Sequence, residues 1–225
     1  LFCGYLCPLG TVQDLLMKLR KAIGFKGIDI KRGSVADKAL RILKYALLFW
    51  IFYMTATASE LFCKNLDPYY AVATGFKGEI TLWMSIISVA VVLILGFLVN
   101  MFWCKYLCPL GAISNSLKFW VWIVVLFAAY YLLGVLGLNV PWWVLLAAFC
   151  VAGYLLEILC GKPKFQVLHI MKNDTKCTHC GLCTKACPYS IDVAGWKNGA
   201  VNAVDCTLCG ECTAVCPDDA IHTGV

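Results

Sequence analysis

Eight cysteines near the C-terminal end of the chain form two groups with one spacing, Cys-x2-Cys-x2-Cys-x3-Cys-Pro. The first group runs from Cys177 to Cys187, and the second, 29 residues later, runs from Cys206 to Cys216. Three thiolates on a tight loop can reach three corners of one iron–sulfur cubane, and the proline after the fourth cysteine keeps a helix from crossing the loop. The spacing therefore predicts ligands for [4Fe–4S] clusters, which exchange single electrons.

The repeated run is that of two-cluster bacterial ferredoxins, in which the fourth cysteine of each run ligates the other cluster. We therefore expect two crossed ligand sets, namely Cys177, Cys180, Cys183 and Cys216 for one cluster, and Cys206, Cys209, Cys212 and Cys187 for the other. Zinc would typically use two separate CxxC pairs instead. Gly181 and Gly210 follow the second cysteine of each run, where a positive φ or a close backbone approach is expected.

A second cysteine pattern, Cys-x3-Cys-Pro-Leu-Gly, also occurs twice, with Cys3 and Cys7 in the first copy and Cys104 and Cys108 in the second. Two such units facing each other would bring four thiolates together. We therefore expect these cysteines to hold one further [4Fe–4S] cluster. Two separate clusters completed by other residues, a redox-active dithiol, and purely structural cysteines stay open as alternatives.

Three of the 15 cysteines stand outside these patterns. Cys150 is expected to be a small packing residue, and Cys160 a structural residue at a helix end. Cys63 is expected to be incidental, with an interchain contact or a ligand for a partner's cofactor as the alternative. His179 lies inside the first cluster loop, where we expect it to face solvent, although a hydrogen bond that tunes the cluster potential is the alternative.

Composition places the elements that carry these cysteines in a membrane. The chain has 225 residues, of which 61% are hydrophobic and 14% charged, whereas a soluble domain is roughly 25% charged. These values exclude a disordered chain, a basic nucleic-acid-binding domain and a simple soluble enzyme. From Phe119 to Leu156 no residue is charged, and one helix of that length would span about 57 Å. A hydrocarbon core is only about 30 Å thick, so this run must fold back between Gly134 and Pro141.

Four membrane-spanning helices are predicted from the apolar runs, near residues 41–59, 80–103, 119–138 and 141–160. A fifth is expected before residue 1, because the chain does not begin with Met and the first Cys-x3-Cys unit has no helix in front of it. The predicted fold is an all-α polytopic membrane domain over residues 1–168. A small α+β ferredoxin domain of the bacterial 2[4Fe–4S] type follows over residues 169–225.

Charge sets the expected orientation. Of the 19 Lys and Arg residues, 17 fall on one side of the four spans, and only Lys64 and Lys77 on the other. The positive-inside rule then places both cysteine patterns on the cytoplasmic side of the cell's inner membrane. Arg41 and Lys44 begin the first span and are expected to reach the headgroups. Gly10 to Ile23 has helical periodicity with basic residues and is expected to lie on the inner surface.

Carboxylates near the spans are the candidate proton acceptors for quinol oxidation. Glu60, Asp67 and Glu79 lie in the predicted outer loop, where the simpler expectation is that they are solvated. Glu157 lies near the inner end of the last span, where a carboxylate is a functional candidate by default. The alternative for Glu157 is pairing with Lys162 or Lys164.

The combination of motifs resembles the polyferredoxin membrane proteins of the NapH and NosR type, which pair Cys-x3-Cys-Pro motifs in a small helical membrane domain with a two-cluster ferredoxin. The resemblance covers nearly the whole chain. It implies electron transfer between the quinone pool and another redox protein, with other subunits of a redox complex as partners. The flavin-bearing domain of the NosR type has no counterpart here, so the chain is more similar to the NapH type.

The expected function is that of a membrane-anchored iron–sulfur electron-transfer subunit, with membrane lipid and quinone as partners and no nucleic acid. Whether it acts as a quinol dehydrogenase or only as a carrier, the residues leave open. A rival hypothesis is an assembly factor or redox sensor for a respiratory metalloenzyme. No phosphate-binding loop, nucleophile constellation or nucleotide fingerprint occurs in the sequence, so chemistry on a terminal substrate is assigned to a partner.

Overall fold

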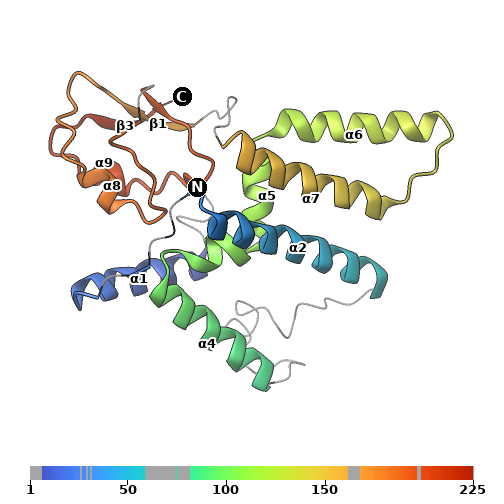
Figure 1. Ribbon diagram of the computed structural model, residues 1–225, viewed down its shortest axis with the longest axis horizontal. Coiled ribbons are helices and arrows are strands. Elements are labelled where there is room, and N and C mark those ends of the chain that lie inside the picture. Colours follow the sequence, from blue (N-terminus) through green and yellow to red (C-terminus); the bar gives the residue numbers. More distant parts are fainter. Residues whose placement is uncertain are drawn as a thin grey trace.

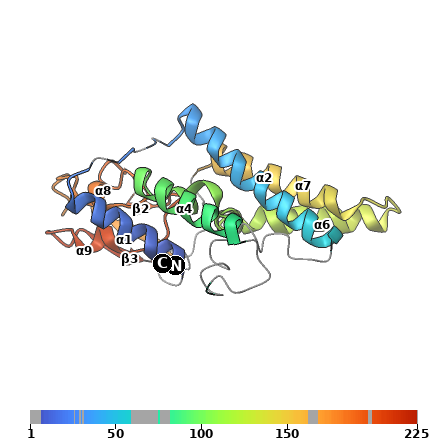
Figure 2. The same ribbon diagram turned by 90° about the horizontal axis from the view of Figure 1, so that it is seen from below.

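The computed structural model describes residues 7–25, 27–28, 30, 32–58, 75, 82–161, 168–196 and 199–224, which form a helical part and a small part with a sheet (Figure 1). The helical part contains α1 (Pro8–Ala22), α2 (Val35–Ala58), α4 (Leu82–Leu98), the π-helix η3 (Trp103–Leu107), α5 (Pro109–Leu117), α6 (Trp120–Val135) and α7 (Trp142–Leu159). The small part contains β1 (His169–Lys172), α8 (Leu182–Ala186), β2 (Ala200–Val201), α9 (Glu211–Ala214) and β3 (Ile221–Gly224). Figure 2 shows the small part and α1 at one end of the molecule, with α2, α6 and α7 extending toward the other.

Two helices, α2 and α7, are long and apolar enough to cross a membrane. The α5–α6 pair meets the same criterion only as one span bent by 93°, and α4 contributes a shorter apolar helix. The described residues therefore give two spans, or three with the bent pair, where the sequence predicted four. The predicted turn between the last two spans is present, because α6 ends at Val135 and α7 begins at Trp142.

The surface of these helices is apolar. None of the residues of α6 is buried, and large side chains such as Trp122, Val124 and Phe127 are more than half exposed. A continuous exposed apolar surface of this kind is unfavourable in water and favourable in lipid. The chain is thus a membrane protein, in agreement with its composition.

The helix α4 ends earlier than the apolar run predicts, at Leu98 rather than near Trp103. The guanidinium of Arg20 in α1 donates hydrogen bonds to the carbonyl oxygens of Phe97 and Leu98 at 2.7 and 3.2 Å. Carbonyl groups at a helix end need such partners, so Arg20 caps α4 from the neighbouring helix. Cys104 consequently lies in the π-helix η3 and not in the span that precedes it.

The two Cys-x3-Cys-Pro units adopt one local structure where they can be compared. Cys7 and Cys108 are both extended, with ψ of 111° and 117°, and each stands immediately before a helix that starts at proline. Proline is favoured at the first helical position because its missing N–H would be unpaired there. The helix predicted over Gly10 to Ile23 is present as α1, with Val12, Leu15 and Leu19 exposed, although its basic residue Arg20 is buried against α4.

The small part is built around a three-stranded antiparallel sheet in the order β2-β1-β3. Its core consists of a few apolar side chains, with Ile170, Val201 and Val193 at most 3% exposed. Gly181 and Gly210 precede α8 and α9 with φ of 75° and 81°. Both predicted positive φ values are confirmed, and glycine is required because a Cβ disfavours this conformation.

We expect Gly181→Ala to lower the free energy of unfolding of the small part by about 1–2 kcal/mol, from the left-handed φ alone. Nothing lies within 4 Å of the added Cβ, so no clash contributes. Denaturant titration of the purified protein measures the change. The control is Gly134→Ala, which also meets open space but lies in α6 at negative φ. It should be neutral or slightly stabilising, and an equal loss in both variants would contradict the backbone explanation.

Candidate iron–sulfur sites

The cysteines of the small part gather around two separate hollows. One hollow of about 390 Å³ is lined by Cys187, Cys206, Cys209 and Cys212 together with apolar side chains such as Tyr189 and Ile191. The other, of about 320 Å³, is lined by Cys177, Cys180, Cys183 and Cys216. Both volumes include the open mouth of the hollow. Each hollow thus combines three cysteines of one run with the fourth cysteine of the other run. We call the first set the inner set and the second the outer set.

The donor chemistry of each hollow fits a [4Fe–4S] cluster. Among the described residues, no three Cys, His, Asp or Glu side chains lie close enough to hold a single metal ion. A zinc ion would need four thiolates at about 2.3 Å, whereas a cubane spaces its ligands more widely. Apolar walls and thiolates are also the environment in which iron–sulfur clusters bind.

The thiols of the inner set need positive charge in order to ionise together. Burial, and next the neighbouring Cys206, raises the pKa of the Cys212 thiol to about 12. Burial also raises the pKa values of the Cys187 and Cys209 thiols. Four adjacent thiolates are therefore unfavourable in the protein alone, and bound iron would supply the charge that stabilises them. In the outer set, the backbone N–H of Ala220 donates a hydrogen bond to Sγ of Cys216 at 3.4 Å, a contact of the kind that tunes cluster potentials.

The structure describes three of the four Cys-x3-Cys-Pro cysteines. Cys104 and Cys108 occupy the π-helix and the cap of α5, and Gly111 allows the close approach of that helix, because an added Cβ would lie 2.8 Å from the Cys104 carbonyl oxygen. Cys7 caps α1. Cys3 lies outside the described residues, so the set of four is carried forward as a proposal.

A cluster of acidic and basic side chains is buried where α2, α7 and the loop before Cys206 meet. We call it the charge cluster, and its members are Asp37, Arg41, Lys44, Glu157 and Asp205, each at most 6% exposed. Arg41 donates two hydrogen bonds to the Asp205 carboxylate at 2.9 and 2.8 Å and one to Asp37 at 3.1 Å, and it also pairs with Glu157. Glu157 accepts further hydrogen bonds from Lys44 and from the hydroxyl of Tyr45, both at 2.7 Å.

The charge cluster corrects one expectation. Arg41 and Lys44 do not reach the headgroups, because both are buried and paired with carboxylates from other elements. Glu157 has these two cations and Tyr45 as partners, while Lys162 and Lys164 lie outside the described residues. A cation in an apolar segment is stabilised most by a buried carboxylate, and here α7 and the small part supply two.

The surroundings of Asp205 favour its ionised form at the boundary with the small part. Burial opposes the charge of Asp205, but the hydrogen bonds and the charge of Arg41 outweigh burial and hold the pKa of that carboxyl well below its usual range. Burial, and next a hydrogen bond to Asp37, raises the pKa of Tyr106 above its usual range. The Tyr106 hydroxyl, which belongs to the Cys104 motif, therefore stays a donor to Asp37 at 2.8 Å.

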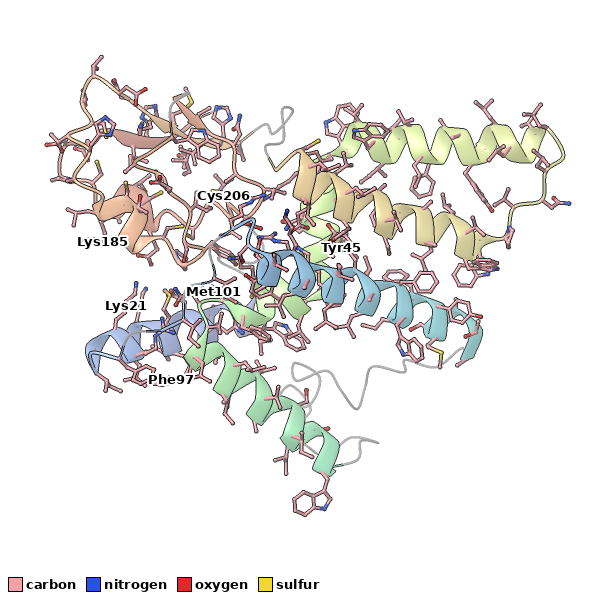
Figure 3. All side chains as sticks on the ribbon, viewed as in Figure 1. Lys21, Tyr45, Phe97, Met101, Lys185 and Cys206 are labelled. Carbon is pink, nitrogen blue, oxygen red and sulfur yellow. The ribbon has the colours of Figure 1, made fainter. Side chains whose placement is uncertain are left out.

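Three further contacts fix the inner set against the membrane helices. The ammonium of Lys118 donates hydrogen bonds to the carbonyl oxygens of Val204 and Cys206 at 2.5 and 2.7 Å. Met101, three residues before Cys104, belongs to the buried apolar core of the small part. The N–H of Val204 donates to the carbonyl of Gly161 at the end of α7. Figure 3 shows Cys206 on the side of the small part that faces α2 and α7, and Lys185 on the side away from them.

Sequence reasoning missed Arg41, Asp205, Lys118 and Met101 as contributors to the site. Asp205 immediately precedes a cluster cysteine, which was the one available signal. Of the other candidates, Cys150 is buried in the core between α2, α5 and α7, and Cys160 is exposed at the end of α7. His179 is exposed, as expected. Cys63, Glu60, Asp67 and Glu79 lie outside the described residues.

Comparisons with known proteins agree with this chemistry. A family model described as "4Fe-4S dicluster domain" matches residues 167–221. A second, described as "4Fe-4S binding domain", matches residues 1–26 and 81–121, which contain both Cys-x3-Cys-Pro units. No solved structure matches the chain.

Curated relatives fall into the same group of proteins. The "Putative electron transport protein YccM" of Escherichia coli is 30% identical over 85% of this chain and 42% of its own length. The "Regulatory protein NosR" of Pseudomonas aeruginosa is 27% identical over 49% of this chain and 15% of its own length. The "Ferredoxin-type protein NapH" of Haemophilus influenzae is 28% identical over 49% of this chain and 36% of its own length. The chain therefore spans less than half the length of each of these relatives.

The fold and the matched domains define an iron–sulfur protein of ferredoxin type with membrane helices. Within that class, the chain belongs to the NapH- and NosR-type 4Fe-4S electron-transfer family.

Proposed function

We propose that the chain is a membrane-anchored subunit that passes electrons between the quinone pool and a partner redox protein. The observation that carries the proposal is the grouping of eight cysteines into two sets of four, one of which is held against the membrane helices by Arg41 and Lys118. Bound in these hollows, [4Fe–4S] clusters would accept and donate single electrons. The chain's own residues would hold the clusters and fix the inner set against the membrane helices.

The proposal assigns each cysteine set a place. Cys206, Cys209, Cys212 and Cys187 hold the inner cluster, and Cys177, Cys180, Cys183 and Cys216 hold the outer one. Cys3, Cys7, Cys104 and Cys108 hold a further cluster at the membrane surface. The hydrogen bond from Tyr106 to Asp37, followed by the contacts of Asp37 with Arg41 and of Arg41 with Asp205, supports this order, since it links the Cys104 motif to the loop of Cys206.

The proposed topology has four spans in residues 1–168, and the ferredoxin domain of residues 169–225 on the cytoplasmic side with both Cys-x3-Cys-Pro units. Its support is the distribution of 17 cations on one side of the predicted spans. Cysteine labelling from outside intact cells tests it. Cys160, which is exposed, should label only after the membrane is permeabilised.

The test of electron transfer uses the full chain in lipid vesicles with ubiquinol or menaquinol as the donor. We expect reduced quinol, or a reduced soluble ferredoxin supplied from the partner side, to change the electron paramagnetic resonance signals of the clusters. Signals that respond to dithionite but to neither physiological class of donor would overturn the role as an electron conduit.

The proposed membrane-surface cluster predicts that Cys104→Ala lowers the iron and sulfide content of the purified protein by one cluster, while both ferredoxin clusters stay. The control is Cys150→Ala, because Cys150 is buried in α7 and lies outside both cysteine patterns, so we expect it to serve packing alone. Iron and acid-labile sulfide analysis measures both variants. Unchanged iron in Cys104→Ala would contradict the site, as would equal losses in the two variants.

Redox sensing is a second candidate, favoured by the description of one relative as a regulatory protein. The two functions predict different stoichiometries for the complex between this chain and its partner enzyme. A stable complex with a redox enzyme at one copy each supports electron transfer, whereas a transient and substoichiometric association supports sensing.

A further inference from the structure

The two ferredoxin sets share one cysteine spacing but have unequal surroundings. At the inner set, the ammonium of Lys118 rests on the carbonyl oxygen of the ligand Cys206, and Arg41 and Arg32 both pair with the adjacent Asp205. Cationic side chains outnumber carboxylates in this region. On the side of the membrane helices, Arg32, Arg41, Lys44, Lys105 and Lys118 are cationic, and Asp37, Glu157 and Asp205 are acidic. The loop of the set itself carries Glu211, which pairs with Lys18 of α1 at 3.1 Å.

The outer set is partly exposed: among its cysteines Cys183 is buried, and Cys177 and Cys216 are half-buried. Cys180 is exposed, and so is the neighbouring His179. The polar contacts of its loops include the Thr178 hydroxyl, which donates to the Asp218 carboxylate at 3.0 Å, so an acidic group lies beside this set. The cation of α8, Lys185, is exposed, where water and salt screen its charge.

We propose that Lys118 is a positioning residue that raises the reduction potential of the inner cluster above that of the outer cluster. The inference rests on the proposed function, because it requires clusters in both hollows. A [4Fe–4S] cluster gains one unit of negative charge when it accepts one electron, so a fixed nearby cation stabilises the reduced form. Lys118 is held in the half-buried space between α5 and the Cys206 loop, where its charge is screened less than that of an exposed lysine.

The unequal potentials give the two clusters different roles. An electron shared between them resides mainly on the inner cluster, next to the membrane helices. The outer cluster, whose ligand Cys180 is exposed, is then the weaker acceptor and the stronger donor once reduced. Electron delivery to a soluble partner therefore takes place from the outer set, and the inner set stores the electron between transfers.

The test is a potentiometric titration of the full chain in detergent or lipid, monitored by electron paramagnetic resonance. Lys118→Met should shift the inner-cluster signal to a lower potential, with at least a tenfold fall in its reduced-to-oxidised ratio at fixed potential, equal to 59 mV for one electron. Lys118→Gln keeps a hydrogen-bond donor without the charge and should shift it similarly, whereas Lys118→Arg should retain the potential. The matched control is Lys176→Met, which removes an exposed lysine next to Cys177 of the outer set and should leave the inner signal unchanged.

The signals are assigned with Cys212→Ser and Cys183→Ser, since serine alters the spectrum of the cluster whose ligand it replaces. In the unmodified protein, the signal altered by Cys212→Ser must titrate at the higher potential, and the reverse order overturns the inference even if no Lys118 variant folds. An unshifted inner signal in Lys118→Met and Lys118→Gln also overturns it. Absence of both ferredoxin signals in the unmodified protein would instead refute the proposed function.

Discussion

Replacing Cys187 by alanine is expected to remove the same ferredoxin cluster as replacing Cys212, although the two cysteines belong to different sequence runs. The structure brings Cys187 into the hollow of Cys206, Cys209 and Cys212, and Cys216 into the other hollow. Each single substitution should therefore halve the iron bound by the ferredoxin domain. Cys183→Ala should remove the other half and leave the signal that Cys187→Ala abolishes.

Iron and sulfide analysis and electron paramagnetic resonance of each variant measure this crossing. Cys160→Ala is the control, because Cys160 is an exposed cysteine at the end of α7 and should have no effect. If Cys187→Ala removed the signal that Cys183→Ala removes, each run would serve its own cluster and the crossed assignment would be wrong.

Besides removing a cluster, the same cysteine substitutions are expected to destabilise the ferredoxin domain. Its sheet has strands of two to four residues, and its buried apolar core is small. Partly buried cysteines of both sets pack against that core. A bound cluster therefore stabilises the fold by linking segments that few other contacts hold together. We expect a lower midpoint of thermal unfolding in Cys212→Ala than in Cys160→Ala.

The parts of this site that the sequence predicted are those with local causes. Cysteine spacing within a loop fixes which thiols can share a cubane, and a glycine at positive φ is required where Gly181 and Gly210 turn the chain into short helices. Proline after cysteine starts α1 and α5 for a similarly local reason. These features need no knowledge of how the elements pack.

The charge cluster could not be predicted because it depends on packing between distant segments. Arg41 meets Glu157 and Asp205 across 116 and 164 residues of sequence. In the sequence, a cation at the start of an apolar run is as consistent with headgroup contact as with a buried pair. The early end of α4 could not be predicted for the same reason, since Arg20, which caps that end, comes from another helix.

Arg41→Met is expected to lower the free energy of unfolding by about 3–5 kcal/mol, because it leaves Asp205, Glu157 and Asp37 with less compensation in a buried site. Denaturant titration in detergent, monitored by the visible absorption of the clusters, measures the loss. The matched control is Arg32→Met, which also removes a cation from Asp205. The Arg32 side chain is 34% exposed, so its loss should cost about 1 kcal/mol or less.

A second substitution separates lost charge balance from lost packing at Arg41. Asp205→Asn in the Arg41→Met background removes one uncompensated carboxylate, so the double variant should be more stable than Arg41→Met alone. If the losses of unfolding free energy in Arg41→Met and Asp205→Asn simply add in the double variant, the two residues do not couple. The contact between Arg41 and Asp205 then does not hold the ferredoxin domain to α2. If they couple as expected, the ion pair beside Cys206 is what fixes the inner set against the membrane helices, because Asp205 is the member of the charge cluster that the ferredoxin domain contributes.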